Sequence, residues 1–133
     1  MVDALTRIQA ALVPGGVLVD TVPVSLRLPV ALDGEPVGEL EDEEWLATVA
    51  AVDGEIERVV AVGLFEPTHE ERYGIVHEFG SGDECLEVVG SWGGTTIPPA
   101  VASRLEHAAR RTTVEHDVRL RLFRRLAVVP YPA

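Results

Sequence analysis

The chain has 133 residues, of which 47% are hydrophobic, so it is expected to form one packed domain rather than a disordered chain. Its net charge is −11 and all eleven basic residues are Arg, which argues against nucleic acid as a partner. The sequence has neither an apolar run near the ~20 residues of a membrane span nor the pattern of a secretory signal at its start. We therefore expect a cytoplasmic protein that does not bind membranes.

The first part of the chain predicts a helix, a strand and a connection. Apolar residues recur at helical spacing over 2–12, and Pro14-Gly15-Gly16 is typical of a helix end. The apolar, β-branched run Val17–Val24 predicts a strand, and its continuous apolarity predicts burial on both faces. Three prolines and Asp33-Gly34 predict an irregular or hairpin-like connection over 25–38.

The remaining segments predict a long helix, a strand, two helices and a final strand. Glu41–Phe65 has the apolar period of an amphipathic helix, which Gly54 is expected to kink or divide. Alternation predicts strands over 71–79 and 113–123. Between them, a capping box predicts a helix that begins at Ser81, and a second helix is expected from Pro98 to about Arg111.

These elements indicate an α+β fold in a single domain over residues 1–133. We expect helices packed on a small mixed or antiparallel sheet of about three strands. No internal repeat or low-complexity segment is found.

The turn Leu12-Val13-Pro14-Gly15-Gly16 and the hydrophobic strand that follows it resemble one segment of a known family. Class I S-adenosylmethionine-dependent methyltransferases carry such a turn before their fifth strand. The order of elements up to Phe123 is also similar to the order in that family, so the chain resembles the C-terminal part of such an enzyme.

The resemblance implies that the cofactor-binding part is absent, because the family holds its cofactor at its first strands. No cofactor is therefore expected to bind to this chain alone, and no G-x-G-x-x-G or Walker-type loop suggests another nucleotide. The implied function is that of a non-catalytic domain acting in assembly or regulation, or of the substrate-side half of a split methyltransferase. Whether the chain is an enzyme stays open at this point.

The resemblance also implies a strand order in which the last strand lies between the other two and antiparallel to them. The strand at 17–24 would then have an unpaired edge, which proteins usually cover or protect. Val17, Leu18, Val19 and Asp20 are therefore interface candidates. The expected partner is a second copy in a homodimer, or another protein chain that pairs with this strand.

His77 and His116 suggest an alternative function, because they lie on the apolar faces of two strands that are expected to be neighbours. The pair fits a hydrogen-bonded core contact, a ligand-binding or acid–base site, or a metal site; we predict no metal site. Tyr73, on the same strand as His77, is a further ligand-binding candidate. The alternative is thus a stand-alone small-molecule-binding α+β protein or enzyme with a pocket that uses His77 and His116.

Two other groups of residues favour structural roles. Arg119, Arg121, Arg124 and Arg125 are expected on an exposed strand face with Glu115 and Asp117 as local partners, although they could also clamp an anion. Cys85, the single cysteine, is expected to fill the core.

Overall fold

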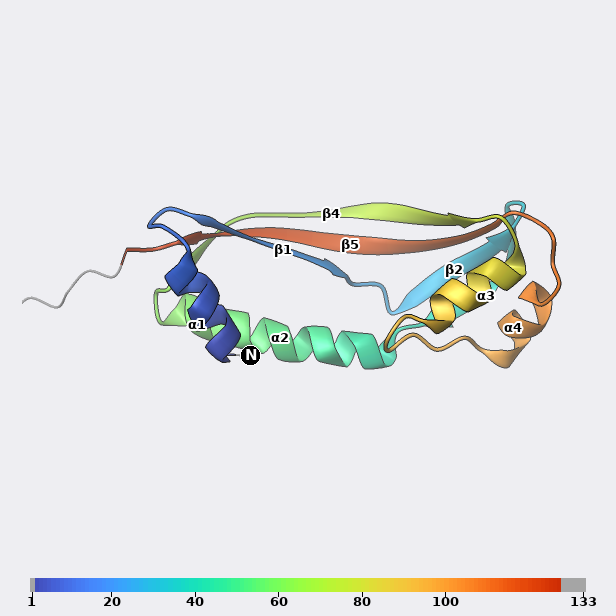
Figure 1. Ribbon diagram of the computed structural model, residues 1–133, viewed down its shortest axis with the longest axis horizontal. Helices are drawn as coiled ribbons and strands as arrows, with labels where there is room; N and C mark the ends of the chain where they lie inside the picture. The colour runs from blue at the N-terminus through green and yellow to red at the C-terminus, as the bar shows by residue number, and fades with distance from the viewer. Residues whose placement is uncertain (1, 128–133) are drawn as a thin grey trace, which may run out of the picture. The chain divides into compact units, whose positions relative to one another are not determined.

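The structure is a computed structural model that describes residues 2–127. Within these residues the fold is α+β, with four helices and an open antiparallel sheet of five strands (Figure 1). The prediction of about three strands is therefore wrong in number, although the fold class and the antiparallel alternative are confirmed. The elements are α1 (Val2–Ala11), β1 (Val17–Pro23), β2 (Arg27–Leu32), β3 (Glu35–Glu41), α2 (Glu43–Ala61), β4 (Phe65–Phe79), α3 (Gly82–Gly90), α4 (Pro99–Leu105) and β5 (Thr112–Arg125).

The two additional strands, β2 and β3, form a hairpin where the sequence predicts an irregular or hairpin-like connection. Asp33 and Gly34 both have positive φ, 46° and 81°, which fits the tight two-residue turns of hairpins. The prolines are tolerated because of where they lie. Pro29 precedes the segment 30–32 that pairs with β5, and Pro36 lies on β3 at the end of the strand order β1-β5-β2-β3.

The chain divides into two compact units. Unit 1 contains Met1–Val22, Val49–Arg72 and Arg119–Ala133, and unit 2 contains Pro23–Thr48 and Tyr73–Val118. Both units therefore include parts of α2, β4 and β5. The expectation of one domain over residues 1–133 stays a prediction.

In unit 1, β5 pairs with β1 and with β4, so the last strand lies between the other two. The backbone N–H of Gly15 donates to the carbonyl oxygen of Arg125 at 3.0 Å, and that of Leu126 donates to the carbonyl oxygen of Leu64 at 3.1 Å. Figure 1 shows α1 beside the C-terminal part of α2, which continues through Gly54 without a break. The hydrophobic core of this unit is a cluster of five buried side chains: Leu5, Ile56, Val59, Phe65 and Phe123.

Strand β1 is not buried on both faces, which corrects the prediction from its continuous apolarity. Val17 and Val19 are 50% and 57% exposed, whereas Leu18 between them packs against the core of unit 1. β1 is the first strand of the order and pairs with β5 alone among the described strands. Its second edge therefore has no strand partner within residues 2–127.

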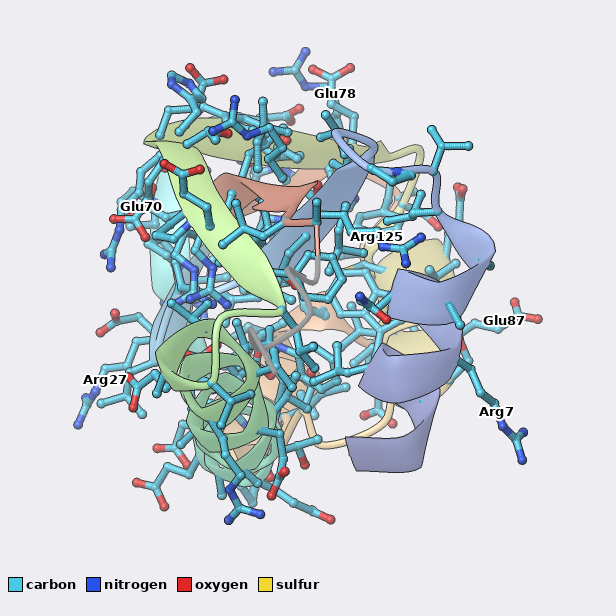
Figure 2. All side chains as sticks on the ribbon, turned by 90° about the vertical axis from the view of Figure 1, so that its left-hand side faces the viewer. Arg7, Arg27, Glu70, Glu78, Glu87 and Arg125 are labelled. Carbon is cyan, nitrogen blue, oxygen red and sulfur yellow. The ribbon has the colours of Figure 1, made fainter. Side chains whose placement is uncertain are left out.

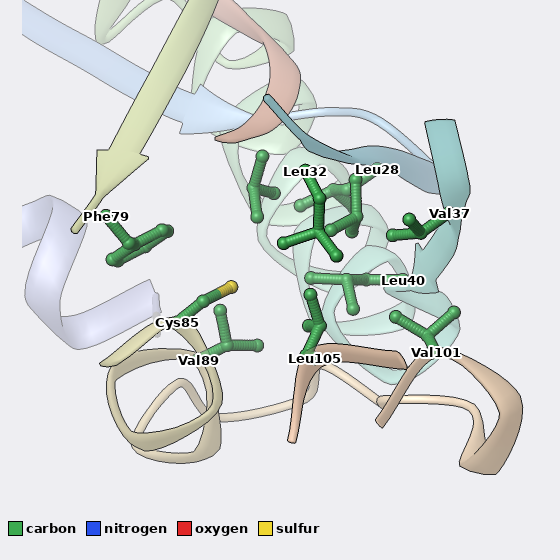
Figure 3. Packing of buried hydrophobic residues seen from close by; sticks show 11 residues of the cluster. Leu28, Leu32, Val37, Leu40, Phe79, Cys85, Val89, Val101 and Leu105 are labelled. Atoms are coloured by element: carbon green, nitrogen blue, oxygen red, sulfur yellow. The ribbon is translucent and has the colours of Figure 1, made fainter. Parts of the chain in front are cut away.

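Unit 2 is built around eleven buried residues from β2, β3, β4, β5 and the short helices α3 and α4 (Figure 3). Cys85 and Val89 of α3 and Leu105 of α4 point toward the leucines of β2 and β3. Burying one such leucine fully contributes roughly 1.5–3 kcal/mol. Cys85 is buried as predicted, and burial followed by the charge of Glu84 raises the pKa of its thiol to about 11.

The approach of α3 to α4 depends on Gly82. Its N–H donates to the carbonyl of Ala108 at 2.8 Å, and a Cβ at this position would lie 2.1 Å from the carbonyl oxygen of Leu105. The predicted start of α3 is confirmed, because the hydroxyl of Ser81 accepts from the N–H of Glu84 at 3.1 Å. The Glu84 carboxylate in turn accepts from the N–H of Gly80 at 2.9 Å.

Three element boundaries differ most from the sequence prediction, and the first is the end of α2 at Ala61 instead of about Phe65. β4 begins at Phe65 instead of Glu71, since its first half is largely polar and exposed and so carries no apolar alternation. α4 ends at Leu105 instead of near Arg111, because His107 adopts a φ of 59° that a helix cannot continue through.

Charged side chains lie mostly at the surface of each unit. Figure 2 shows Arg7 and Glu70 of unit 1 pointing outward, whereas Arg125 reaches toward α1. There the Arg125 guanidinium donates to the carbonyl of Leu12. Among residues 2–127, no helix has the length and apolar character needed to cross a membrane.

Candidate functional site

His77 on β4 and His116 on β5 face each other in unit 2. Their Nε2 atoms are 3.2 Å apart, and the ring centroids are separated by 4.7 Å at an interplanar angle of 71°. The structure thus brings together the two histidines that the sequence analysis placed on neighbouring strands. His77 also packs against Trp92, with ring centroids 5.1 Å apart.

The contact between the two Nε2 atoms restricts protonation of the pair. One nitrogen must donate and the other must accept, so the two rings cannot both be cationic while this hydrogen bond is made. Burial, followed by the charge of His77, lowers the pKa of His116, and the carboxylates of Asp42 and Asp117 oppose this shift only in part. This shift favours the neutral form of His116.

The histidine pair borders a cavity of about 330 Å³ that lies entirely within unit 2. The walls are mainly aromatic and aliphatic, and a few polar groups interrupt them. The lining residues are Pro23, Leu28, Asp42, Trp45, His77, Trp92, Gly93, Thr95 and His116. Both tryptophans of the chain and two of its four histidines therefore meet at this cavity.

Among the described residues that line the cavity, Asp42 is the one with a formal charge, and it is only 4% exposed. It precedes α2, and its Oδ1 accepts a hydrogen bond from the hydroxyl of Thr95. Its backbone N–H donates to Leu26 at 3.0 Å. A buried carboxylate is costly unless hydrogen bonds or an opposite charge compensate it, so this residue is the main electrostatic feature of the cavity.

Two further contacts fix the aromatic walls. The indole Nε1 of Trp45 donates to the carbonyl of Pro23 at 3.1 Å. Gly94, with a φ of +85°, passes so close to α2 that a Cβ there would lie 2.9 Å from the backbone nitrogen of Trp45. Backbone hydrogen bonds between Glu41 and Thr96, of 3.0 and 2.7 Å, hold the same loop against the start of α2.

The other candidate residues do not belong to this cavity. Tyr73 is 40% exposed and is not part of the lining, although its role as a ligand-binding residue stays a prediction. Within residues 2–127, no three His, Cys, Asp or Glu side chains are grouped so as to hold a metal ion. Val17, Leu18, Val19 and Asp20 all lie on β1 in unit 1.

Sequence reasoning missed a charged cluster in unit 1. Arg119 donates to both carboxylate oxygens of Asp53, at 3.0 and 2.8 Å, and Arg121 donates to Asp20 and to Asp53, in each case at 2.7 Å. The prediction of an exposed arginine face is therefore wrong for these two residues. Their side chains are only 10% and 14% exposed.

The electrostatics of this cluster follow from the burial of both signs of charge. Burial raises the pKa of Asp53, but hydrogen bonding to Arg119 and the charges of Arg121 and Arg119 outweigh it and lower the pKa overall. The hydrogen bond to Asp53 raises the pKa of Arg119. The four charges balance, so the cluster has no excess charge for an anionic ligand.

No protein-family model, curated protein or solved structure matches this chain.

Proposed function

We propose that unit 2 binds a small ligand in the cavity beside His77 and His116. The observation that supports this function is the convergence of both tryptophans and the histidine pair on one hollow of about 330 Å³. Ligand pockets of proteins commonly have volumes of roughly 300–1,000 Å³, apolar and aromatic walls, and a few placed polar groups. The cavity has this composition.

The histidine pair provides directional contacts as well as surface. In the neutral pair, the ring that donates from Nε2 has Nδ1 as an acceptor, and the ring that accepts at Nε2 has Nδ1–H as a donor. The pair therefore presents one acceptor and one donor at a fixed separation. Together with Asp42 and Thr95 these groups would orient a flat ligand against the tryptophans.

The first test is a screen of one-ring and two-ring aromatic fragments, followed by the fluorescence of Trp45 and Trp92. Since these are the only tryptophans, every change in indole emission reports on the cavity. We expect several fragments to change the emission with dissociation constants of about 0.1–1 mM, which corresponds to about 4–5.5 kcal/mol of binding free energy.

Two alanine variants and one control assign the binding to the cavity. His77→Ala and His116→Ala are expected to weaken fragment binding, whereas His107→Ala, which changes a histidine that is not part of the lining, is expected to leave it unchanged. Emission that does not respond to any fragment at millimolar concentration would refute the proposal.

A second candidate function is assembly through β1, as expected for a non-catalytic methyltransferase-like domain. Among the described strands β5 pairs with β1, β2 and β4, whereas β1 pairs with β5 alone. The unpaired edge of β1 and the exposure of Val17 and Val19 favour a protein partner there.

The partner that fits this edge is a second copy of β1. If two copies pair antiparallel about Val19, Val17 lies opposite Thr21 and Leu18 lies opposite Asp20, so no like charges face each other. Such pairing would satisfy the backbone groups of the edge and cover the exposed valines. The resulting sheet would continue from one copy into the other.

Light scattering tests the assembly. We expect the wild-type chain to have twice its monomer mass at micromolar concentration and Val19→Lys to be monomeric, because a charge would enter the paired edge. Val62→Lys adds the same charge to an exposed valine outside β1 and should leave the mass unchanged. In the same samples, calorimetry with S-adenosylmethionine is expected to give no binding; a monomeric wild-type chain would exclude the homodimer.

A further inference from the structure

We propose that the cavity of unit 2 selects a small organic cation, in particular a substituted ammonium group. This inference rests on the proposed ligand-binding function and specifies the chemical class of the ligand. It follows from the charge of the lining, the aromatic walls and the state of the histidine pair.

The charge of the lining favours a cation. Asp42 is buried and borders the cavity, and within the described part of the chain neither Arg nor Lys lines it. Thr95 donates to Oδ1 of Asp42, and the structure shows no side-chain donor to Oδ2 among the described residues. A ligand with a positive charge would compensate this carboxylate, whereas an anionic ligand would meet like charge in a site of low dielectric constant.

The aromatic walls favour the same class of ligand. Quaternary and substituted ammonium groups are attracted to the electron-rich faces of aromatic rings, and tryptophan is the most effective ring. Trp45 is held by its hydrogen bond to Pro23, and Trp92 packs against His77, so both indoles are fixed before a ligand arrives. A pre-organised pair of rings costs less ordering entropy on binding.

The lowered pKa of His116 favours a neutral ring, which does not oppose a cation. The charged and titratable groups that act on His116 are His77 on β4, Asp42 before α2 and Asp117 on its own strand. Two of these three groups are carboxylates, and the pKa of His116 is lowered mainly by burial. With both rings neutral, the formal charge of the described lining is the negative charge of Asp42.

The test compares three probes of one shape at pH 7.5: choline, the neutral 3,3-dimethylbutan-1-ol and the anionic 3,3-dimethylbutanoate. Binding is followed by the two indole N–H signals of Trp45 and Trp92 in a nitrogen–proton correlation spectrum. We expect choline to bind at least about tenfold more tightly than the neutral alcohol, and the anion to bind most weakly.

Two variants with the same change in charge locate the effect. Asp42→Asn keeps the size of the side chain and its acceptor for Thr95, and it should remove the preference for choline. Glu44→Gln removes one charge from an exposed residue in the first turn of α2 and should leave the preference intact. If Asp42→Asn fails to fold, the three wild-type affinities decide the question.

The possible outcomes separate this inference from the proposed function. Equal affinity of choline and the alcohol would overturn cation selection and leave ligand binding supported. Binding of neutral aromatic fragments without any binding of choline would also overturn cation selection and leave ligand binding supported. If neither the probes nor the fragments move the indole signals, the proposed function and the cation preference are both wrong.

Discussion

Replacing Asp53 by Ala is expected to remove about 3–5 kcal/mol of the free energy of unfolding. The substitution would leave Arg119 and Arg121 largely buried with Asp20 as their one remaining carboxylate in the cluster. Buried guanidinium groups without partners lose their hydration and gain little in return, which is why breaking a buried ion pair costs more than the intact pair contributes. Urea unfolding followed by circular dichroism measures the loss.

A matched substitution in the same unit separates burial from charge. Glu66→Ala also removes a carboxylate that is paired with an arginine, Arg124, but both side chains of this pair are about half exposed. Its cost is expected to be at most about 1 kcal/mol. A loss for Asp53→Ala as small as that for Glu66→Ala would show that the buried cluster does not stabilise unit 1.

Acid titration provides a second readout of the same cluster. Because the pKa of Asp53 is lower in the folded chain than the ordinary value of 3.8 for this side chain, the unfolded chain takes up this proton first as the pH falls. The stabilisation is complete above the unfolded pKa and is lost as the pH falls through the folded one. The wild-type chain should therefore lose more stability below about pH 4 than Asp53→Ala does.

Gly82→Ala is expected to destabilise unit 2 by about 1–3 kcal/mol or more, through overpacking. The new Cβ would lie 2.1 Å from the carbonyl oxygen of Leu105 and 2.8 Å from its carbonyl carbon, and backbone atoms cannot move aside as a flexible side chain can. α3 and α4 would have to separate, which would open the core around Cys85 and Val89. Tryptophan emission during unfolding follows this unit alone.

Gly90→Ala is the control in the same helix. No heavy atom lies within 4 Å of a Cβ at this position, so the substitution is expected to be neutral or to stabilise by about 0.4–1 kcal/mol through a less flexible unfolded chain. Equal effects of the two substitutions would mean that the close approach of α3 and α4 at Gly82 is unimportant for stability.

Local patterns predicted most elements of the fold. α1, α2 and α3 were predicted from helical spacing and from the Ser81 cap, and β5 from its alternation. The hairpin of β2 and β3 was not counted as strands, because prolines normally argue against central strands. The prolines are tolerated because of how β2 and β3 pair with neighbouring strands, and local sequence carries no information about this pairing.

The candidate site was predictable only in part. Alternation placed His77 and His116 on facing strands, and this pair is the centre of the cavity. Asp42 was missed because it lies in an acidic run that fits the first turn of a helix, and its burial depends on Thr95, fifty-three positions later. Trp45 lies on α2 and Trp92 lies in the loop after α3, so only the path of this loop brings both side chains to one cavity.

The burial of Arg119 and Arg121 also could not be predicted from local sequence. They alternate with apolar residues along β5 and share its charged face with Glu115 and Asp117, which predicts an exposed face. Their partners, Asp20 on β1 and Asp53 on α2, are distant in sequence, so only the assembled fold distinguishes a buried cluster from a solvated face.

Cys85 is the chain's only thiol and is buried, so the rate at which it is labelled measures the opening of unit 2. A thiol with a pKa of about 11 reacts very slowly with alkylating reagents while it is enclosed, and at the ordinary rate once α3 lifts away. At low reagent concentration the labelling rate therefore reports the fraction of time that this core spends open. Unit 1 has no cysteine, so the measurement isolates one half of the molecule without any engineered label.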